Sequence, residues 1–548
     1  MAAWRYRHAM RRIARREALA VAAGLGTATV VAACTRPGHA SVAAPAGTAP
    51  SASSGRATAT PNAPTPSTSL PGPSPAGPDW AGLASQLRGR LLRKTTSGYA
   101  TAARLYNPRF DATARPTAIV AAATPSDVAV AVRFAADARV PFAVRSGGHS
   151  YPGWSTSPGL VIDVSSLGGV TVDSTHHTAR IGAGARLVNV YAALAARGVG
   201  IAGGSCPSVG IAGLALGGGV GVLGRAWGLT CDAVRSVDIV TADGAARTVD
   251  ATRDADLFWA LRGGGGGSFG AVTGFTVDVR PVPTVSTFYL QWPFTVAADV
   301  VEAWQGWAHS ADARLFSTCK LLADPRTGTR RALVAGTWIG PSSDLSARLA
   351  PLRAKLPTPS STSIHAHTYA DAMLLEAGCS GQSATSCLAG ALAPAKRQPF
   401  AATSSIVAEP LSSAAIAMAV THATEAMNVA GIYEGGVSFD SLGGAIGAVG
   451  GGATAFGHRA AVATAQYTAT WTDTGASPAR FDAYVRGFRS ALAPWLGSAA
   501  YVNYADASIT NFGPAYWGSN YPRLQTVKRA YDPHNLFTFP QSVRLPGA

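Results

Sequence analysis

Residues 140–150 read Val-Pro-Phe-Ala-Val-Arg-Ser-Gly-Gly-His-Ser, an apolar run that leads directly into a glycine-rich loop. The run predicts a short strand, and the two glycines allow close approach of the backbone to other groups. Outward from it, 118–123 and 160–164 predict two more strands. Thr124-Pro-Ser-Asp127 is typical of a helix start, and it predicts a helix over 128–138. Strands and helices therefore alternate around the quoted loop.

The next segments predict shorter antiparallel elements. Residues 170–182 indicate a hairpin, 187–197 an amphipathic helix, and 203–228 is very rich in glycine. G-x-G-x-x-G spacings begin at Gly219 and Gly265.

A dinucleotide fingerprint of that spacing requires a strand before it and a helix after it. Around Gly265 the order is reversed, because 254–261 indicates a helix and 271–279 a strand. We therefore expect an α+β protein rather than a doubly wound sheet. The glycines instead permit tight packing and expose N–H groups to an anion.

Four stretches resemble the signatures of berberine bridge enzyme-like oxidases. They are Arg145–Ser150, Gly204–Gly213 with Gly217–Gly221, Leu257–Gly270, and Asn520–Leu524 with Tyr531–Ser542. The resemblance covers residues 110–545 in the expected order. It implies a two-part PCMH-type FAD-binding domain, similar to that of vanillyl-alcohol oxidase, and a substrate domain whose antiparallel sheet is covered by helices.

The composition and the resemblance together divide the chain into five parts. We expect an export signal with a lipobox (1–34), a tether of Pro, Ala, Ser and Thr (35–78), the FAD-binding domain (79–282), the substrate domain (283–498) and a C-terminal segment that completes the FAD domain (499–548).

His149 and Cys206 both lie in glycine-rich loops that resemble the flavin-linking loops of the family. Taken singly, such a histidine is usually a loop residue and such a cysteine a buried thiol. An imidazole and a thiolate are nevertheless suitable nucleophiles. The resemblance implies that His149 bonds the flavin 8α carbon and Cys206 bonds C6, so that FAD is held by two covalent links.

The same motifs imply further contacts to FAD. The expected cofactor-binding residues are Arg145, Ser146, Gly147, Gly148, Ser150, Val209, Gly210, Gly213, Gly218, Gly219, Gly270, Val272 and Asn503.

The catalytic base is expected to be a tyrosine. Tyr516 resembles the family's tyrosine base, and Asp440 resembles a carboxylate that assists it by accepting a proton or orienting the hydroxyl. A free tyrosine has a pKa near 10, so that such a partner is required. Tyr504 and Tyr467 are rival bases, each of which is equally well explained as a packed aromatic residue.

The leading functional hypothesis is an oxidase. It takes hydride from a hydroxyl-bearing substrate, such as a sugar, a glycoside or a natural-product alcohol, and is reoxidised by O2 to give H2O2. Val209 resembles the family's oxygen gate, where a small side chain admits O2. A dehydrogenase that reduces a quinone or another carrier is the alternative, and a non-catalytic binding protein on the same scaffold is a third reading.

The N-terminus predicts export. Arg15-Arg16 followed by an uncharged run resembles a twin-arginine signal, with the Sec route as the alternative. Val31-Ala-Ala-Cys34 resembles a lipoprotein box, which predicts a lipid anchor at Cys34 or, without lipidation, a secreted protein. The formal net charge is +16, but no basic run with interleaved aromatics suggests nucleic-acid binding.

Four further cysteines have structural interpretations. Cys379 and Cys387 are eight residues apart in a polar stretch and could form a disulfide in an oxidising compartment. Cys231 and Cys319 have apolar neighbours and are expected to be buried thiols. No Cys/His spacing fits a zinc site.

Overall fold

A computed structural model describes residues 77–473 and 475–547. The expected export signal, Cys34 and all but the end of the tether lie outside the described residues, so these features stay predictions. Within the described part of the chain, no helix has the length and apolar character needed to cross a membrane.

A four-stranded sheet contains the strand that was predicted directly before the glycine-rich loop 146–150. Its strands, in spatial order, are β1 (Arg90–Arg93), β2 (Ala118–Ala121), β4 (Leu160–Asp163) and β3 (Phe142–Arg145). β2, β4 and β3 are parallel, and β1 is antiparallel to β2. Helix α4 (Pro125–Asp137) begins at the expected signal, where the Thr124 side chain accepts from the Asp127 backbone N–H in a capping box. Because β3 ends at Arg145, the loop 146–150 leaves the carboxyl end of this edge strand.

A five-stranded antiparallel sheet packs beside it. Its strands, in spatial order, are β5 (Val170–Asp173), β6 (Thr178–Gly182), β10 (Ala271–Asp278), β8 (Val234–Val240) and β9 (Ala246–Asp250). Helix α8 (Ala255–Ala260) comes before β10, in the order that argued against a dinucleotide fingerprint. Helix α5 (Leu187–Ala195) and the short helices α6 (Ile211–Leu216) and α7 (Gly224–Trp227) lie in the same half.

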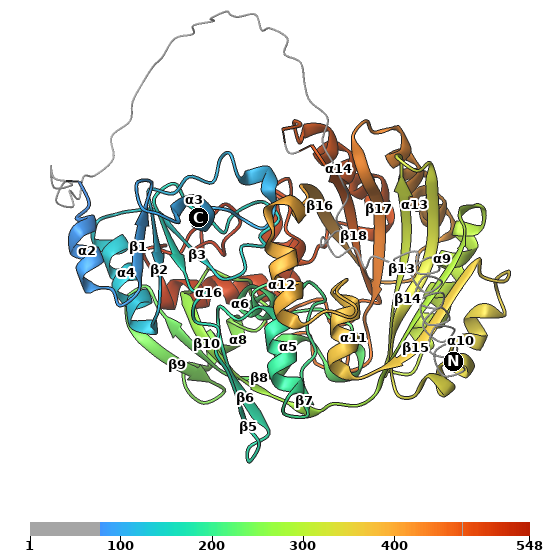
Figure 1. Ribbon diagram of the computed structural model, residues 1–548, viewed down its shortest axis with the longest axis horizontal. Helices are drawn as coiled ribbons and strands as arrows, with labels where there is room; N and C mark the ends of the chain where they lie inside the picture. The colour runs from blue at the N-terminus through green and yellow to red at the C-terminus, as the bar shows by residue number, and fades with distance from the viewer. Residues whose placement is uncertain (1–76, 474, 548) are drawn as a thin grey trace, which may run out of the picture.

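A seven-stranded antiparallel sheet forms the other half of the molecule (Figure 1). Its strands, in spatial order, are β15 (Ser361–His367), β12 (Val285–Pro293), β14 (Thr329–Ile339), β13 (Leu315–Asp324), β17 (Ile432–Ser441), β18 (Ala463–Trp471) and β16 (Phe400–Val407). Helices α9 (Ala297–Ser310), α10 (Ser342–Arg353), α13 (Ser413–Glu425) and α14 (Ala479–Leu496) cover one face.

Side-chain alternation along these strands separates a dry face from a polar one. Cys319, Val437 and Phe439 pack into the core under the helices. Their neighbours Lys320 and Asp440 point to the opposite face, toward the half that contains the four- and five-stranded sheets. The helix-covered antiparallel sheet and the two-part first half confirm the expected α+β fold class.

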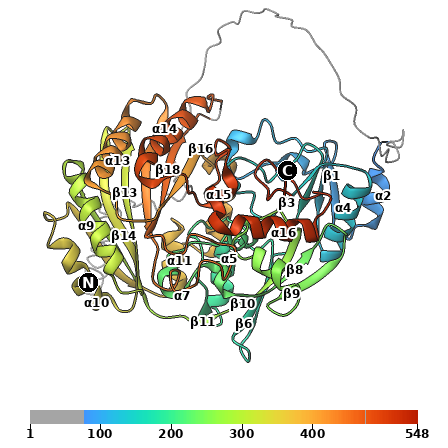
Figure 2. The ribbon, with the colours of Figure 1, turned by 180° about the vertical axis from the view of Figure 1, so that it is seen from behind.

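The C-terminal segment returns to the first half. Helices α15 (Phe512–Trp517) and α16 (Tyr521–Tyr531) pack there (Figure 2), and α16 contacts α8. The buried ammonium of Lys528 pairs with Asp532 at 2.6 Å and donates to the Ser268 carbonyl, which fixes the segment beside the glycine-rich turn.

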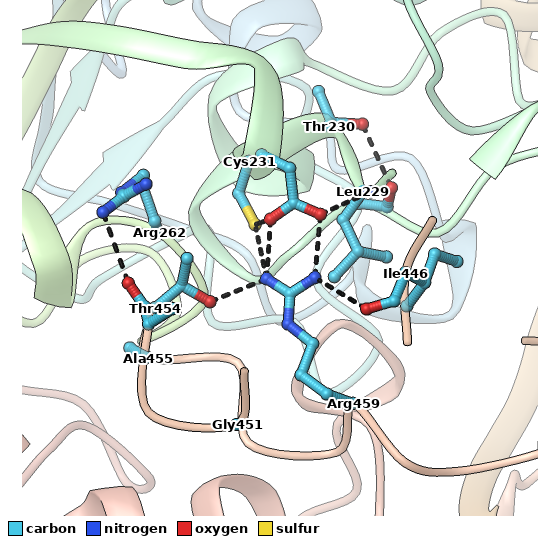
Figure 3. Close-up of polar contacts among 12 residues, drawn as sticks. Leu229, Thr230, Cys231, Arg262, Ile446, Gly451, Thr454, Ala455 and Arg459 are labelled. Carbon is cyan, nitrogen blue, oxygen red and sulfur yellow. Dashed lines mark hydrogen bonds and ion pairs between the residues drawn. The ribbon is translucent and has the colours of Figure 1, made fainter. Parts of the chain in front are cut away.

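Ion pairs that are buried or half-buried join the two halves. Arg459 binds both carboxylate oxygens of Asp232, at 2.7 and 2.6 Å, and its guanidinium also contacts Cys231, Thr454 and Ile446 (Figure 3). Two more bidentate pairs cross between the halves, Arg109 with Asp482 and Arg397 with Asp111. Since breaking a buried pair leaves one charge uncompensated, these contacts fix how the halves meet.

The remaining cysteines agree with the expectations from the sequence. Cys379 and Cys387 form a disulfide between the end of helix α11 (Tyr369–Glu376) and helix α12 (Ala384–Leu392). Cys231 and Cys319 are buried free thiols. The described residues contain no group of three or more His, Cys, Asp or Glu side chains that could hold a metal ion.

Candidate functional site

One cavity of about 500 Å³ is lined by both halves of the molecule. The first half contributes the loop after β3 (146–151), the loop around Cys206 (204–210) and the glycine turn 264–267. The second half contributes polar side chains of β13, β17 and β18, and the C-terminal segment adds 501–505 and 537–541. The cavity therefore lies where segments distant in the sequence converge.

Close contact of two glycines brings the His149 and Cys206 loops together. A Cβ on Gly210 would lie 2.0 Å from Ser146 Oγ, and a Cβ on Gly147 would lie 2.3 Å from Gly210 N. Real side chains do not tolerate such distances, so each position requires glycine. Both His149 and Cys206 consequently face the same cavity.

The His149 ring is held on two sides. Tyr106 stacks on it with ring centroids 3.7 Å apart, and His149 Nε2 lies 3.0 Å from Ser208 Oγ. Burial, together with the nearby positive charge of Arg186, places the pKa of His149 well below its usual value, so the ring is neutral. Within the described part of the chain, Nδ1 makes no hydrogen bond. A neutral imidazole with a fixed orientation and an available nitrogen is a suitable nucleophile.

The cavity also has the backbone that a dinucleotide requires. Gly265 and Gly267 adopt positive φ values of 84° and 81° in the turn that lines it, a conformation that favours glycine. This turn and the two loops with His149 and Cys206 offer close backbone approach along one cavity. These residues fit FAD.

Two tyrosines in the cavity wall have different surroundings. Tyr504 is stacked on Tyr151, with ring centroids 5.6 Å apart, and its hydroxyl makes no hydrogen bond to any described residue. Burial, and then the charge of Asp440, raise the pKa of Tyr504. The Tyr516 hydroxyl, in contrast, donates to Gln541 Oε1 at 2.8 Å and accepts from the Asp506 backbone N–H at 3.1 Å.

Comparisons with known proteins agree on one family. Residues 116–250 match the model "FAD binding domain", and residues 500–544 match "Berberine and berberine like". An uncharacterized FAD-linked oxidoreductase of Bacillus subtilis, YgaK, is 34% identical over 465 residues, which is 84% of this chain and 97% of YgaK. The chain belongs to the berberine bridge enzyme-like FAD-linked oxidoreductases.

Solved structures of this family share the fold. Berberine bridge enzyme-like 1 of Physcomitrella patens is 30% identical with a TM-score of 0.78, over 85% of this chain and 99% of that one. A chitooligosaccharide oxidase is 25% identical with a TM-score of 0.76, again over 85% and 99%. The relationship extends over both halves, so the half that contains the seven-stranded sheet is related as well.

Most residues expected to bind FAD in this oxidoreductase line the cavity. They are Ser146, Gly147, Gly148, His149, Ser150, Cys206, Val209, Gly210, Gly213, Gly270, Val272 and Asn503. Arg145, Gly218 and Gly219 depart from the expectation. Arg145 is buried behind the wall, where it pairs with Asp163 at 2.7 Å. Gly218 and Gly219 allow close packing of the chain instead. A Cβ on Gly218 would clash with Phe456, and a Cβ on Gly219 would clash with Thr230.

The expected pairing of Tyr516 with Asp440 needs correction. The groups that act on the Tyr516 hydroxyl are Asp506, Arg489 and Gln541. Asp440 acts instead on Tyr504 and Tyr151. The rival base Tyr467 faces the helices on the other side of the sheet and is fully buried there, with its hydroxyl on Ser405 Oγ. It cannot reach a substrate in the cavity.

The sequence analysis missed several polar residues of the oxidoreductase's cavity. Gln466 Nε2 donates to the Tyr151 hydroxyl at 2.6 Å, and Lys320 and Glu376 are two charged groups in the same wall. The polar residues Thr318 and Lys320 on either side of the apolar Cys319 in β13 are the one signal that could have found this face.

Proposed function

We propose that this oxidoreductase oxidises a hydroxyl group of a small molecule, with FAD linked covalently to His149 and Cys206, and that O2 is its electron acceptor. The observation that carries the proposal is the Tyr504 hydroxyl. It makes no hydrogen bond to any described residue, and it lines the same cavity as both nucleophiles. The name of the chitooligosaccharide oxidase supports both the hydroxyl-bearing substrate and the use of oxygen.

The bound FAD supplies the redox chemistry, because it accepts the hydride from the substrate carbon and passes two electrons to O2, giving H2O2. The protein's task is to orient the substrate and to move the hydroxyl proton. Substrate O–H breaks as the carbonyl forms, so a base must lie within hydrogen-bond reach of that oxygen.

Tyr504 and Asp440 form the proposed proton path. The substrate hydroxyl gives its proton to the Tyr504 oxygen while the proton of Tyr504 moves to the Asp440 carboxylate, whose charge acts on the Tyr504 hydroxyl. This transfer requires a Tyr504–Asp440 hydrogen bond to form when the substrate is bound. Burial raises the pKa of Asp440, and this effect outweighs the opposing influences of the Lys320 charge and of the hydrogen bond that Ser438 Oγ donates at 2.9 Å. A carboxylate with a raised pKa is a better proton acceptor than a solvated one. Tyr516, whose hydroxyl already donates one hydrogen bond and accepts another, keeps a structural role.

The experiment compares two matched tyrosine variants. Sugars, glycosides and phenolic alcohols are first screened for peroxide release, and the best substrate is used for anaerobic flavin reduction. Tyr504→Phe should slow reduction by roughly 10²–10⁴-fold, the usual contribution of a general base. Tyr516→Phe should change it by less than about tenfold, or 1.4 kcal/mol of barrier. A larger loss of the reduction rate in Tyr516→Phe than in Tyr504→Phe would identify Tyr516 as the base. Small and equal losses in the two variants would exclude both tyrosines as the base.

A further inference from the structure

Lys320 is a buried charge that the proposed proton path does not use. It lies on β13, directly opposite Ser438 of β17, and its side chain lines the cavity. Lys320 is only 3% exposed, yet its ammonium makes no hydrogen bond or ion pair with any described residue. An ammonium has three donors and no acceptor. A buried ammonium with three unused donors is costly unless a ligand supplies acceptors.

Glu376 is the second charged group of this wall. It is the last residue of α11, it lines the cavity, and its carboxyl also makes no hydrogen bond or ion pair within the described part of the chain. Helix α11 is firmly placed, because the Tyr369 hydroxyl donates to the Ile201 carbonyl at 2.9 Å. The helix also lies beside α5 of the FAD half (Figure 1). Glu376 is therefore held on a rigid element.

The two charges act on each other without touching. Lys320 lowers the pKa of Glu376, and Asp440 and Glu376 are the two largest charge influences on Lys320. An anionic ligand group at this place would be repelled by the carboxylates of Asp440 and Glu376. A cationic ligand group would be repelled by the Lys320 ammonium. A hydroxyl meets both requirements, because it accepts one hydrogen bond and donates another.

We propose that Lys320 and Glu376 bind one hydroxyl of a polyhydroxylated substrate, a saccharide or glycoside, so that Lys320 Nζ donates to it and Glu376 accepts from it. The inference rests on the proposed function only in taking this cavity as the substrate site. It narrows the expected hydroxyl-bearing substrates to saccharides and glycosides, and it names the two residues that select them. An alcohol with a single hydroxyl places that group at Tyr504 and has no second hydroxyl for Lys320 and Glu376. The two residues therefore do not strengthen its binding.

Binding is measured without turnover. Cellobiose, maltose and chitobiose are titrated by calorimetry into the flavin-loaded Tyr504→Phe protein, alone and combined with Lys320→Met, Glu376→Gln or both. 4-Methoxybenzyl alcohol is the single-hydroxyl probe. Lys355→Met, which removes an exposed lysine outside the cavity, is the matched control. Replacing an unpaired buried ammonium with methionine should not unfold the chain, and thermal melting checks this.

We expect at least one saccharide to bind, and each single variant to weaken it by roughly 10- to 100-fold, the contribution of a hydrogen bond to a charged group. The double variant should lose little more than either single variant, because both residues hold one hydroxyl. 4-Methoxybenzyl alcohol should bind equally to all four proteins, and Lys355→Met should change nothing.

Several results would overturn the proposal. The first is that no saccharide of the panel binds, and the second is that the Lys320 and Glu376 variants bind saccharides as tightly as the parent protein. The third is that the losses of affinity in the double variant are additive. The fourth is that 4-methoxybenzyl alcohol loses as much affinity as the saccharides do. Peroxide release by the wild-type protein tests the proposed function separately. If it oxidises simple alcohols while saccharides neither bind nor react, the function stands and this inference falls.

Discussion

The ring of Tyr106 lies flat against the ring of His149, with the centroids 3.7 Å apart and the planes 14° from parallel. The chain next to Tyr106 is held by the seven-stranded sheet, because the Asn107 side chain donates to the carbonyl of Phe400 in β16 at 2.8 Å. This sheet therefore helps to set the orientation of the histidine that is proposed to bond the flavin.

Removing this stack should impair attachment at His149. In a Cys206→Ala background, where His149 is the only proposed link, Tyr106→Ala should slow flavin attachment by roughly 2- to 10-fold, which corresponds to the 0.5–1.5 kcal/mol of an aromatic pair. Tyr106→Phe keeps the ring and serves as the control. The measurement is the time course of flavin that remains with acid-precipitated protein. Equal rates for Ala and Phe would exclude an orienting role for the stack.

The Gly147–Gly210 contact should not tolerate a side chain. Gly210→Ala places a methyl group 2.0 Å from Ser146 Oγ, so we expect a loss of stability of roughly 1–3 kcal/mol or more, as for other overpacked sites. Flavin content should fall with it. Gly487→Ala is the control, because nothing lies within 4 Å of its Cβ and a helical Ala is favoured over Gly by about 1 kcal/mol. Chemical denaturation and flavin absorbance measure both effects, and a Gly210→Ala protein with wild-type stability would contradict the contact.

Val209 should control access of O2. It lines the cavity three residues after Cys206. Val209→Leu should slow reoxidation of the reduced flavin by O2 at least about tenfold, or 1.4 kcal/mol of barrier, and leave anaerobic reduction unchanged. Val209→Ala should reoxidise as fast as wild type. Stopped-flow mixing of reduced protein with oxygenated buffer gives both rates. Slow reoxidation already in the wild type would favour the dehydrogenase alternative.

Saccharide binding should depend on the ionisation of Glu376. Burial raises the pKa of its carboxyl from 4.5 to about 7, and Lys320 is the charged group that opposes this shift. Glu376 is therefore protonated below about pH 7 and becomes the better acceptor above it, so binding should tighten as the pH rises. We expect roughly a three- to tenfold change between pH 5.5 and 8.5, since hydrogen bonds to ionised groups are about twice as strong. In Glu376→Gln the saccharide affinity should not change with pH in this range. A pH dependence that persists in this variant would show that another group causes it.

Local sequence signals predicted the FAD half well. The capping signal at Thr124 and the glycine loop after β3 depend on neighbouring residues, and both lie where the pattern places them. The catalytic pairing depends on contacts between distant residues. Tyr516 and Tyr504 look alike in sequence, and only the contacts with Gln541 and the Asp506 backbone show that the Tyr516 hydroxyl is occupied. A hydrophobic periodicity in the sequence could not show that Lys320 of β13 and Glu376 at the end of α11 line the same wall of the cavity.

Retention of flavin after denaturation tests the two proposed covalent links to FAD directly. Wild type, His149→Ala, Cys206→Ala and the double variant are loaded with FAD, denatured, and analysed by gel fluorescence and intact mass. We predict that the wild type and both single variants keep one flavin on the denatured chain and that the double variant releases it. Wild-type protein that loses its flavin on denaturation, or a double variant that keeps it, would contradict the account.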